Sequence, residues 1–353
     1  MFTPKNDFST HILHWYKTHA RLLPWRISKL PYQIWISEVI MQQTRVDQGL
    51  PYYLRFTESF PTVFDLNNAS EDDVLRLWQG LGYYSRARNM KTAAKQIVEN
   101  FNGVFPQDFD QIKSLKGVGS YTAAAIASMA FGLPHAVVDG NVYRVLSRYF
   151  DINLPINSNH GIKYFNQLAQ ELLFTHDPGT YNQAIMEFGA LQCKPSNPDC
   201  SSCVLATGCL ALKNKTIDIR PIKNPGVAVQ NRFLNYFLLT DQNSILIQKR
   251  EENDIWKGLY QLPLLETESN TEAEKILINP FFPGLTQHST FKINSVTELK
   301  HKLTHRQLHL RFFELALNPL PALPYSAVNI NQWHQFAFPK PIHHYLKKLF
   351  GGP

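Results

Sequence analysis

The spacing of apolar residues divides this chain into two parts. Up to about residue 212, apolar side chains recur three and four positions apart, as Phe8, Ile12 and Trp15 do, which is the period of a helix with one buried face. Beyond about residue 230 they alternate with polar residues, as in the segment 308–312, which is the period of a half-buried strand. The pattern therefore predicts an all-α first domain and an α+β second domain.

Local signals place the ends of several elements. Pro31 is expected to open a helix, Ser70 to cap a helix with an acidic first turn, and residues 122–131 to form an alanine-rich helix. In the second part, residues 233–240 and 245–249 are predicted to pair as a β-hairpin.

A polar stretch with Pro221 and Pro225 separates the two parts, and this composition is typical of a linker. We therefore predict a helical domain over residues 1–212, a linker over 213–230 and a second domain over 231–353. With 353 residues and 44% hydrophobic content, the chain is long enough for two buried cores.

The formal net charge of +7 and the pI near 9.1 suit an anionic partner, although many enzymes share such a modest excess. A cluster of Arg86, Arg88, Lys91 and Lys95 fits either a DNA-facing helix or an ordinary solvated one. No apolar run approaches ~18 residues, which argues against a membrane span. The opening segment does not read as a signal peptide, so we expect a cytoplasmic protein.

All four cysteines of the chain lie in one short segment. Cys193, Cys200, Cys203 and Cys209 form a C-x6-C-x2-C-x5-C run, which favours four thiolates around one centre. Zinc and a [4Fe-4S] cluster both take four cysteines, but structural zinc usually has two short knuckles and this run has one. We therefore expect a [4Fe-4S] cluster. Zinc and a pair of disulfides are the alternatives, and disulfides would need an oxidising compartment.

Three further features have both a functional and a structural interpretation. Gly117 and Gly119 allow a tight turn whose N–H groups face a phosphate at the start of the next helix, yet glycine turns also join helices that bind nothing. Glu38 lies among apolar residues that would favour its protonated form, as a general acid requires, but a lone glutamate more often lies on the wet face of a helix. Asp139 precedes a helical run, where an aspartate is more often an ordinary N-cap.

Taken in order along the chain, these motifs resemble those of the endonuclease III-like superfamily of DNA glycosylases, and closely those of its MutY family of adenine glycosylases. The resemblance covers nearly the whole chain. It rests on LPWR (23–26), WISEVIMQQT (35–44), GLGYYSRARN (80–89), LKGVGSYTA (115–123), VVDGNV (137–142) and the cysteine run. It implies an all-α helix-hairpin-helix glycosylase fold with a [4Fe-4S] cluster loop, followed by an α+β Nudix-like domain.

The resemblance also implies an activity: a monofunctional adenine DNA glycosylase of base excision repair, which removes adenine mispaired with 8-oxoguanine or guanine in double-stranded DNA. Glu38 would protonate adenine at N7 and later assist the attack of water, and Asp139 would stabilise the sugar cation or bond to it transiently. Asn141 would orient Asp139, and Tyr121 would contact the reacting centre. Bifunctional relatives have a lysine where Tyr121 stands, and a phenol cannot form their Schiff base.

The same resemblance assigns residues that expose and hold the base, which must leave the duplex before it can react. Gln43 and Tyr83 would insert into the duplex beside the estranged base, which has lost its pairing partner. Arg26 and Gln183 would line the adenine pocket. Arg86 and the hairpin glycines would contact the DNA. On local sequence alone, a packed core aromatic is the less favoured alternative for Tyr83.

The second domain resembles the Nudix-like domain with which such enzymes recognise 8-oxoguanine. Residues 256–263 look like its characteristic loop, but no REx2E-like acidic array follows, so we expect recognition without hydrolysis. Leu303-Thr304-His305 aligns with the family's Phe-Ser-His lesion-sensing loop; it keeps a hydroxyl and an imidazole and lacks the aromatic. In the cysteine segment only Lys194 is basic, which should weaken its phosphate contacts.

Two other functions fit parts of the sequence. A thymine-mismatch glycosylase shares the cysteine run, the hairpin and the tyrosine, but Glu38 and the long second domain argue against it. A lesion-binding protein without activity would not need Glu38, Tyr121, Asp139 and Asn141 together. We therefore expect a monomeric enzyme of bacterial type that associates with the nucleoid through DNA and has no membrane contact.

Overall fold

The computed structural model describes residues 5–226, 228–241, 243–251, 254–271, 293–317, 320 and 323–352. Contacts between Cα atoms divide the chain into two compact units. The helical unit comprises Met1–Asn68 and Asn89–Pro225, and the mixed unit comprises Ala69–Arg88 and Gly226–Pro353. The short segment 69–88 is therefore grouped with the C-terminal part of the chain.

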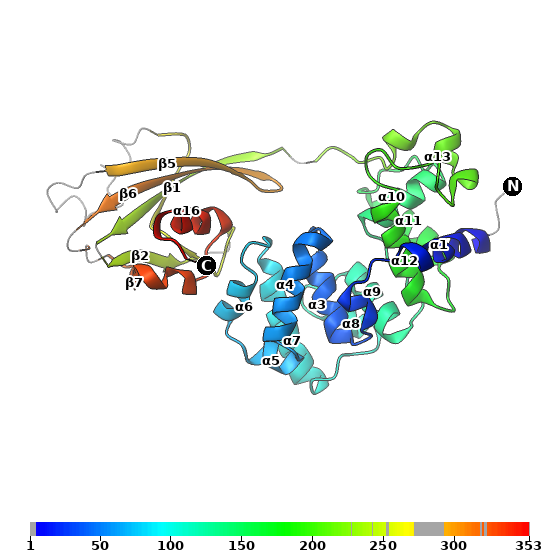
Figure 1. Cartoon of the computed structure of the whole chain (residues 1–353), viewed down its shortest axis with the longest axis horizontal. Helices are drawn as coiled ribbons and strands as arrows, with labels where there is room; N and C mark the ends of the chain where they lie inside the picture. The colour runs from blue at the N-terminus through cyan, green and yellow to red at the C-terminus, as the bar shows by residue number, and fades with distance from the viewer. Residues whose placement is uncertain are drawn as a thin grey trace. The chain divides into compact units, whose positions relative to one another are not determined.

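The helical unit consists of helices joined by short connections (Figure 1). Its helices in the described part of the chain are α1 (Lys5–His19), α2 (Pro24–Ile27), α3 (Pro31–Met41), α4 (Val46–Ser59), α5 (Val63–Asn68), α8 (Phe109–Ser114), α9 (Ser120–Phe131), α10 (Gly140–Tyr149), α11 (Asn159–Leu172), α12 (Pro178–Leu191) and α13 (Leu210–Lys213), with 3-10 turns η1 (Ala206–Gly208) and η2 (Ile217–Ile219). Helix α7 (Ser85–Phe101) begins in the mixed unit and continues in the helical one.

The predicted helix signals in this unit are confirmed. Pro31 is the first residue of α3, where its missing N–H leaves no helical hydrogen bond unmade. The apolar stripe of α1, with Phe8, Ile12 and Trp15, is buried in a core shared with α10, α11 and α12. This core fixes the segments on either side of Asp139, and therefore the place of that carboxylate.

The mixed unit is built on a sheet with the strand order β3-β2-β1-β6-β5, in which β4 also pairs with β1 and β7 with β2. Its described elements are α6 (Glu71–Leu77), β1 (Gln230–Thr240), β2 (Ser244–Lys249), β3 (Tyr260–Gln261), β4 (Leu264–Thr267), β5 (Ile293–Lys302), β6 (Arg306–Ala316), β7 (Ser326–Asn329), η3 (Ile330–Gln335) and α16 (Lys340–Phe350). Strands β1 and β6 are parallel, whereas β1–β2 and β5–β6 are antiparallel.

Side-chain packing against the sheet explains its stability. Helix α16 covers one face (Figure 1), where Tyr345 stacks on Phe312 with ring centroids 4.1 Å apart.

The predicted β-hairpin is confirmed by the pairing of Thr240 with Ile245. A second hairpin, β5–β6, carries residues 303–305 at its turn. The predicted fold class, a helical part followed by a strand-rich part with a mixed sheet, is confirmed.

Segment 69–88 is held in the mixed unit by polar contacts. Ser70 caps α6 as predicted, accepting a hydrogen bond from the backbone N–H of Asp73 at 3.1 Å. The Asp72 carboxylate binds the ammonium of Lys249 and accepts a hydrogen bond from the Tyr260 hydroxyl at 3.2 Å. No helix among the described residues has the length and hydropathy to cross a bilayer.

Candidate active site

Glu38 lies in the middle of α3 with only 9% of its surface exposed. Its neighbours Trp35 and Ile36 are fully buried. Burial raises the pKa of Glu38 to about 7 because it disfavours the charged carboxylate. The charge of Asp139 adds to this rise, while a hydrogen bond from Tyr121 and the charge of Arg26 oppose it. The wet-face interpretation is therefore wrong, and Glu38 retains a proton close to neutral pH.

Tyr121 lies in the first turn of α9 and shares a hydrogen bond with the Glu38 carboxyl. Its hydroxyl also lies 3.3 Å from the Sδ of Met186. Burial, and then the charges of Glu38 and Asp139, raise the pKa of Tyr121 well above its usual value. The phenol therefore stays neutral and supplies a fixed hydroxyl dipole beside the acid.

Asp139 caps helix α10, so its carboxylate is fixed by the start of that helix. Its Oδ1 accepts hydrogen bonds from the N–H groups of Asn141 and Val142, both at 2.8 Å. Its Oδ2 accepts a bond from the Asn141 side-chain amide at 2.7 Å. Burial raises the pKa of Asp139, whereas these bonds and the nearby Arg144 favour the charged form. The N-cap and functional interpretations are therefore compatible.

Asn141 is itself held by Arg144, whose Nη2 donates to the Asn141 Oδ1 at 2.8 Å. Arg144 is buried and also donates to the backbone oxygens of Gly189 at 2.6 Å and Cys193 at 2.7 Å. The orientation of Asp139 thus depends on a hydrogen-bonded chain that reaches the first cysteine. Arg144 was not among the residues expected at the site, although its i, i+3 spacing from Asn141 places both side chains on one helix face.

Arg26 and Gln183 are each oriented by a residue that the sequence analysis did not assign to the site. The Nη2 of Arg26 donates to Glu187 at 2.7 Å. The hydroxyl of Tyr16 donates to the Oε1 of Gln183 at 3.1 Å, and the Arg26 guanidinium lies 5.7 Å from the Tyr16 ring centroid. Glu187 could have been recognised from the sequence in the same way as Glu38, as a lone acid in an otherwise apolar helical run.

The two carboxyls thus occupy different environments. Glu38 is held by one phenol in apolar surroundings, and Asp139 accepts three hydrogen bonds at a helix start. Pairs of carboxyls in such contrasting settings divide the roles of proton donor and fixed anion. The arrangement is suited to protonating a leaving group while stabilising a neighbouring cation.

The predicted helix-hairpin-helix is formed by α8, a turn and α9. Gly117 has a φ of +79°, and a Cβ there would lie 2.6 Å from the Cβ of Asn89, so the turn requires glycine. Gly119 is the N-cap of α9. In the part of the chain that the structure describes, no side chain caps this helix. The first N–H groups of α9 are therefore available to an anion such as a DNA phosphate.

Comparisons with known proteins agree with this geometry. Residues 36–184 match the HhH-GPD superfamily of base excision DNA repair proteins, and residues 235–348 match the NUDIX domain family. An adenine DNA glycosylase of Buchnera aphidicola subsp. Baizongia pistaciae is 36% identical over 339 residues, which cover 95% of this chain and 93% of that protein. The chain belongs to the adenine DNA glycosylase family. It is a base excision repair glycosylase.

Other family members and solved structures extend this likeness. The adenine DNA glycosylase of Homo sapiens is 42% identical over 213 residues, 58% of this chain and 39% of that protein. A thermostable thymine-DNA glycosylase of known structure has a TM-score of 0.56 at 29% identity, covering 60% of this chain and 97% of its own. A trapped endonuclease III–DNA covalent intermediate has a TM-score of 0.53 at 23% identity, covering 61% and 99%, which shows a shared fold.

Gln43 and Tyr83, the residues predicted to insert into DNA, have an unusual backbone conformation. Their φ angles are +56° and +48°, in a backbone region that residues other than glycine rarely adopt. Gln43 is exposed, and Tyr83 keeps 47% of its surface exposed. Strained, exposed residues of this kind are typical of functional sites. The core interpretation of Tyr83 is therefore wrong.

Arg86 does not occupy the solvent-facing position expected of a phosphate contact. It is 9% exposed, and its guanidinium lies 5.0 Å from the Trp78 ring centroid and 5.6 Å from that of Tyr83. Burial lowers the pKa of Arg86 to about 10. Its cation packs against aromatic faces, so Arg86 supports Tyr83.

In the mixed unit, Thr304 and His305 are exposed at the turn between β5 and β6. The Thr304 Oγ1 forms a 2.7 Å hydrogen bond with the hydroxyl of Tyr83. Thr304, His305 and Trp256 line a pocket of about 600 Å³ within this unit. The structure therefore joins a predicted insertion residue to the predicted lesion-sensing loop.

The four cysteines are free thiols at the end of the helical unit, so the disulfide alternative is not found. Burial raises the pKa of Cys203 to about 11, and the charges of the other three cysteines add to the rise. Among the described residues, no three His, Cys, Asp or Glu side chains converge as the ligands of a single metal ion would. The charges of the other three cysteines act on Cys203, so the four thiols lie in one neighbourhood, as the ligands of a four-iron cluster must.

Arg148 of α10 holds the cysteine segment in place. Its guanidinium donates to the backbone oxygen of Lys194 at 2.7 Å and to that of Ile217 at 3.0 Å. Its Nη1 lies 3.5 Å from the Sγ of Cys193. A buried cation beside a cysteine sulfur suits the negative charge of a cluster ligated by four thiolates, so these residues fit an iron-sulfur cluster.

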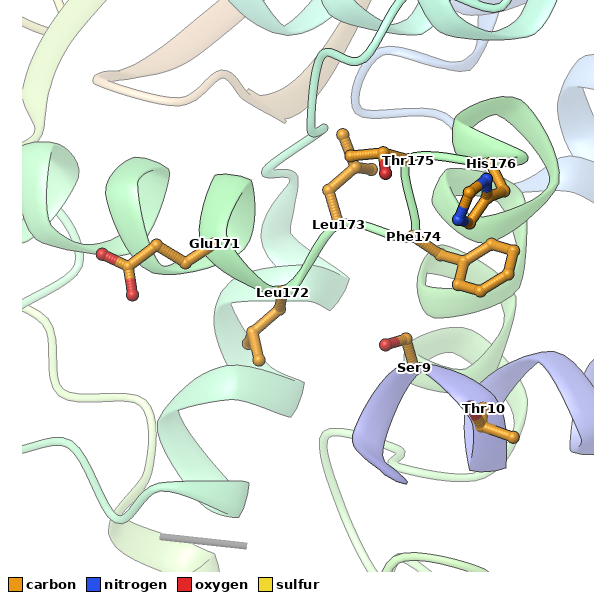
Figure 2. Close-up of a pocket in the computed structure, with 8 residues that line it drawn as sticks. All are labelled: Ser9, Thr10, Glu171, Leu172, Leu173, Phe174, Thr175 and His176. Atoms are coloured by element: carbon orange, nitrogen blue, oxygen red, sulfur yellow. The ribbon is translucent and has the colours of Figure 1, made fainter. Parts of the chain in front are cut away.

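A separate pocket of about 370 Å³ lies between α1 and the connection from α11 to α12. Figure 2 shows the residues that line it, from Ser9 and Thr10 on α1 to residues 171–176. The Glu171 carboxylate points away from the other labelled side chains (Figure 2). None of the predicted site residues lines this pocket, so it is not the adenine pocket.

Proposed function

We propose that this enzyme hydrolyses the N-glycosidic bond of adenine mispaired with 8-oxoguanine or guanine in double-stranded DNA. The observation that supports this most is the pairing of a buried Glu38, whose pKa is near 7, with the fixed carboxylate of Asp139. Adenine departs poorly as an anion, so the reaction needs a proton donor for the base and a negative charge for the sugar. Curated relatives at 32–36% identity bear the name adenine DNA glycosylase.

In the proposed reaction, Glu38 transfers its proton to N7 of the flipped adenine while the bond between the sugar C1′ and N9 breaks. The bonding electrons leave with the base. Asp139, held by Asn141, stabilises the sugar cation that remains. Glu38, now a carboxylate, accepts a proton from the water that adds to C1′, which restores the acid. The neutral phenol of Tyr121 keeps the Glu38 carboxyl in place through this cycle.

We assign recognition of the base opposite adenine to the β5–β6 turn. Thr304 and His305 offer a hydroxyl and an imidazole to the polar edge of 8-oxoguanine, and the Tyr83–Thr304 bond presents the turn beside an insertion residue. The aromatic that the family has in this loop is replaced by Leu303, which packs against the core of the mixed unit. We therefore propose that hydrogen bonding carries the discrimination.

A single-turnover assay with labelled duplexes tests the proposal. Adenine release from A:8-oxoG and A:G duplexes, with no release from A:T, is the expected result. A T:G duplex tests the alternative suggested by the likeness to a thymine-DNA glycosylase. Release of thymine from T:G, with A:8-oxoG intact, would overturn the proposal, and binding of A:8-oxoG without release of any base would indicate a recruiting protein.

Strand cleavage after adenine release is expected to require alkali. Tyr121 occupies the position of the lysine nucleophile in bifunctional relatives, and its neutral phenol cannot form a Schiff base with the sugar. Gel analysis with and without hydroxide checks this, and borohydride trapping should yield no covalent adduct. Tyr121→Lys is the matched gain-of-function variant. An efficient adduct with the unmodified protein would contradict the prediction.

Replacing both Thr304 and His305 with alanine should reduce the preference for A:8-oxoG over A:G. Polar base contacts of this kind contribute roughly 1–3 kcal/mol of discrimination, so the ratio of rates should fall by about tenfold. Leu303→Ala is the matched control and should change the ratio less. An unchanged ratio in the double variant would place lesion recognition elsewhere.

We also propose that Cys193, Cys200, Cys203 and Cys209 hold a [4Fe-4S] cluster. The cluster would have a structural role, because its ligands lie at the end of the helical unit and are connected to Asp139 through the side chains of Arg144 and Asn141. Binding would release protons, since burial raises the pKa values of Cys200, Cys203 and Cys209.

A further inference from the structure

Glu187 is a buried carboxylate in α12 that the proposed reaction does not use. It is 1% exposed and receives four hydrogen bonds from two arginines. Arg21 donates to it from its backbone N–H at 3.0 Å, its Nε at 2.8 Å and its Nη2 at 2.7 Å. Arg26 donates from its Nη2 at 2.7 Å. Burial alone would raise the pKa of Glu187, but these bonds lower it to about 2, so it stays charged.

These contacts tie Glu187 to both residues assigned to the adenine pocket. Arg26, which Glu187 fixes, also donates to the backbone oxygen of Arg21 at 3.2 Å. The Tyr16 ring lies against the Arg26 guanidinium and its hydroxyl holds Gln183. One carboxylate in α12 therefore sets the position of side chains from α1, α2 and the loop between them.

The charge of Arg26 also acts on Glu38. The groups whose charge or hydrogen bonding acts on Glu38 are Tyr121 from α9, Asp139 before α10 and Arg26 from α2. Arg26 favours the carboxylate form of Glu38, which is the inactive form of a general acid. Beside Arg26 lie Arg21, Glu187 and Tyr16, and the charge of Asp47 acts on Arg21. Glu187 is the buried anion of this group, and two cations bind it directly.

We propose that Glu187 is a positioning residue for base excision: it fixes Arg26 in the adenine pocket and offsets the charge of the two arginines, so that Glu38 keeps its proton. This inference rests on the proposed role of Glu38 as the acid. It predicts that the charge balance of Arg21, Arg26 and Glu187 sets the alkaline limb of the pH–rate profile. A merely structural Glu187 would change the rate without moving that limb.

Four variants test this in single-turnover assays on the A:8-oxoG duplex across pH. Glu187→Gln removes a negative charge and should shift the alkaline limb to lower pH by roughly half a unit, less than a charge in direct contact would cause. Arg21→Gln removes a positive charge and should shift the limb to higher pH. The double variant restores the charge sum and should return the limb toward the wild-type position. Glu187→Asp should retain the limb while lowering the rate.

Opposite shifts for the two single variants, cancelled in the double variant, support the proposal. A limb that stays fixed in all variants overturns it. Arg21→Gln keeps the test valid if Glu187→Gln fails to fold, because the Arg21 side chain is one third exposed. A carbon-13 NMR titration of the Glu38 carboxyl in the DNA-free protein, assigned with Glu38→Gln, measures the same shifts without any substrate. It therefore separates failure of this inference from failure of the proposed function.

Discussion

Replacing Glu38 with glutamine is expected to lower the rate of adenine excision by roughly 10²- to 10⁴-fold, the usual contribution of a general acid. The amide keeps the shape of the side chain and has no proton to transfer to the base. Duplex binding should persist, because the hairpin and the proposed insertion residues are unchanged. Single-turnover kinetics and a binding assay on the same A:8-oxoG duplex measure the two effects. Near-normal excision by the variant would remove Glu38 from the acid role.

The pH dependence provides an independent check on the same residue. Burial raises the pKa of Glu38 to about 7, so the acid is protonated below that pH and loses its proton as the pH rises through it. The single-turnover rate of the wild-type enzyme should therefore fall above about pH 7. In the Glu38→Gln variant this alkaline limb should disappear along with most of the rate. A wild-type limb near the ordinary glutamate pKa would mean that the burial of Glu38 does not control the reaction.

Replacing Cys200 with serine is expected to abolish the proposed cluster and to lower the free energy of unfolding by several kcal/mol, because metal binding in such sites is part of the folding free energy. The cysteine segment is joined to α10 through Arg148 and Arg144, so its loss should also loosen Asp139. Iron analysis, visible absorbance and thermal unfolding measure the three parts of this prediction.

Ser196→Ala is the matched control, since Ser196 is an exposed residue of the same loop. It should retain the iron, the colour and the stability of the wild type. One zinc ion per chain in the wild-type protein would contradict the cluster assignment. Full stability of Cys200→Ser would show that the cluster is not structural.

Helix starts could be predicted because each depends on residues only a few positions apart. Pro31 opens α3, Ser70 caps α6 and Asp139 caps α10, and in each case the local backbone alone provides the reason. The alternation around residues 308–312 likewise records one buried face of a strand. The Gly117 turn was predictable because only glycine fits its positive φ.

The partners of the proposed catalytic side chains could not be predicted in this way. Glu38 depends on Tyr121 and Asp139, and Glu187 binds arginines more than 160 residues away. Helical periodicity shows that a face is buried, but it does not show which distant residue covers it. The burial of Arg86 against Trp78 is of the same kind: the charge pattern predicts a solvated or DNA-facing cation, and aromatic packing decides otherwise.

By itself, the sequence determined the helical and strand-rich parts, the caps and turns, the cysteine run and the motifs that place the chain in its family. Only the tertiary structure decided that Glu38 holds a proton near neutral pH, that Tyr83 bonds to Thr304, and that segment 69–88 belongs with the C-terminal part of the chain. The physical reason is that capping, turn formation and periodicity depend on near neighbours. Desolvation and charge compensation depend on which distant surfaces the folded chain brings into contact.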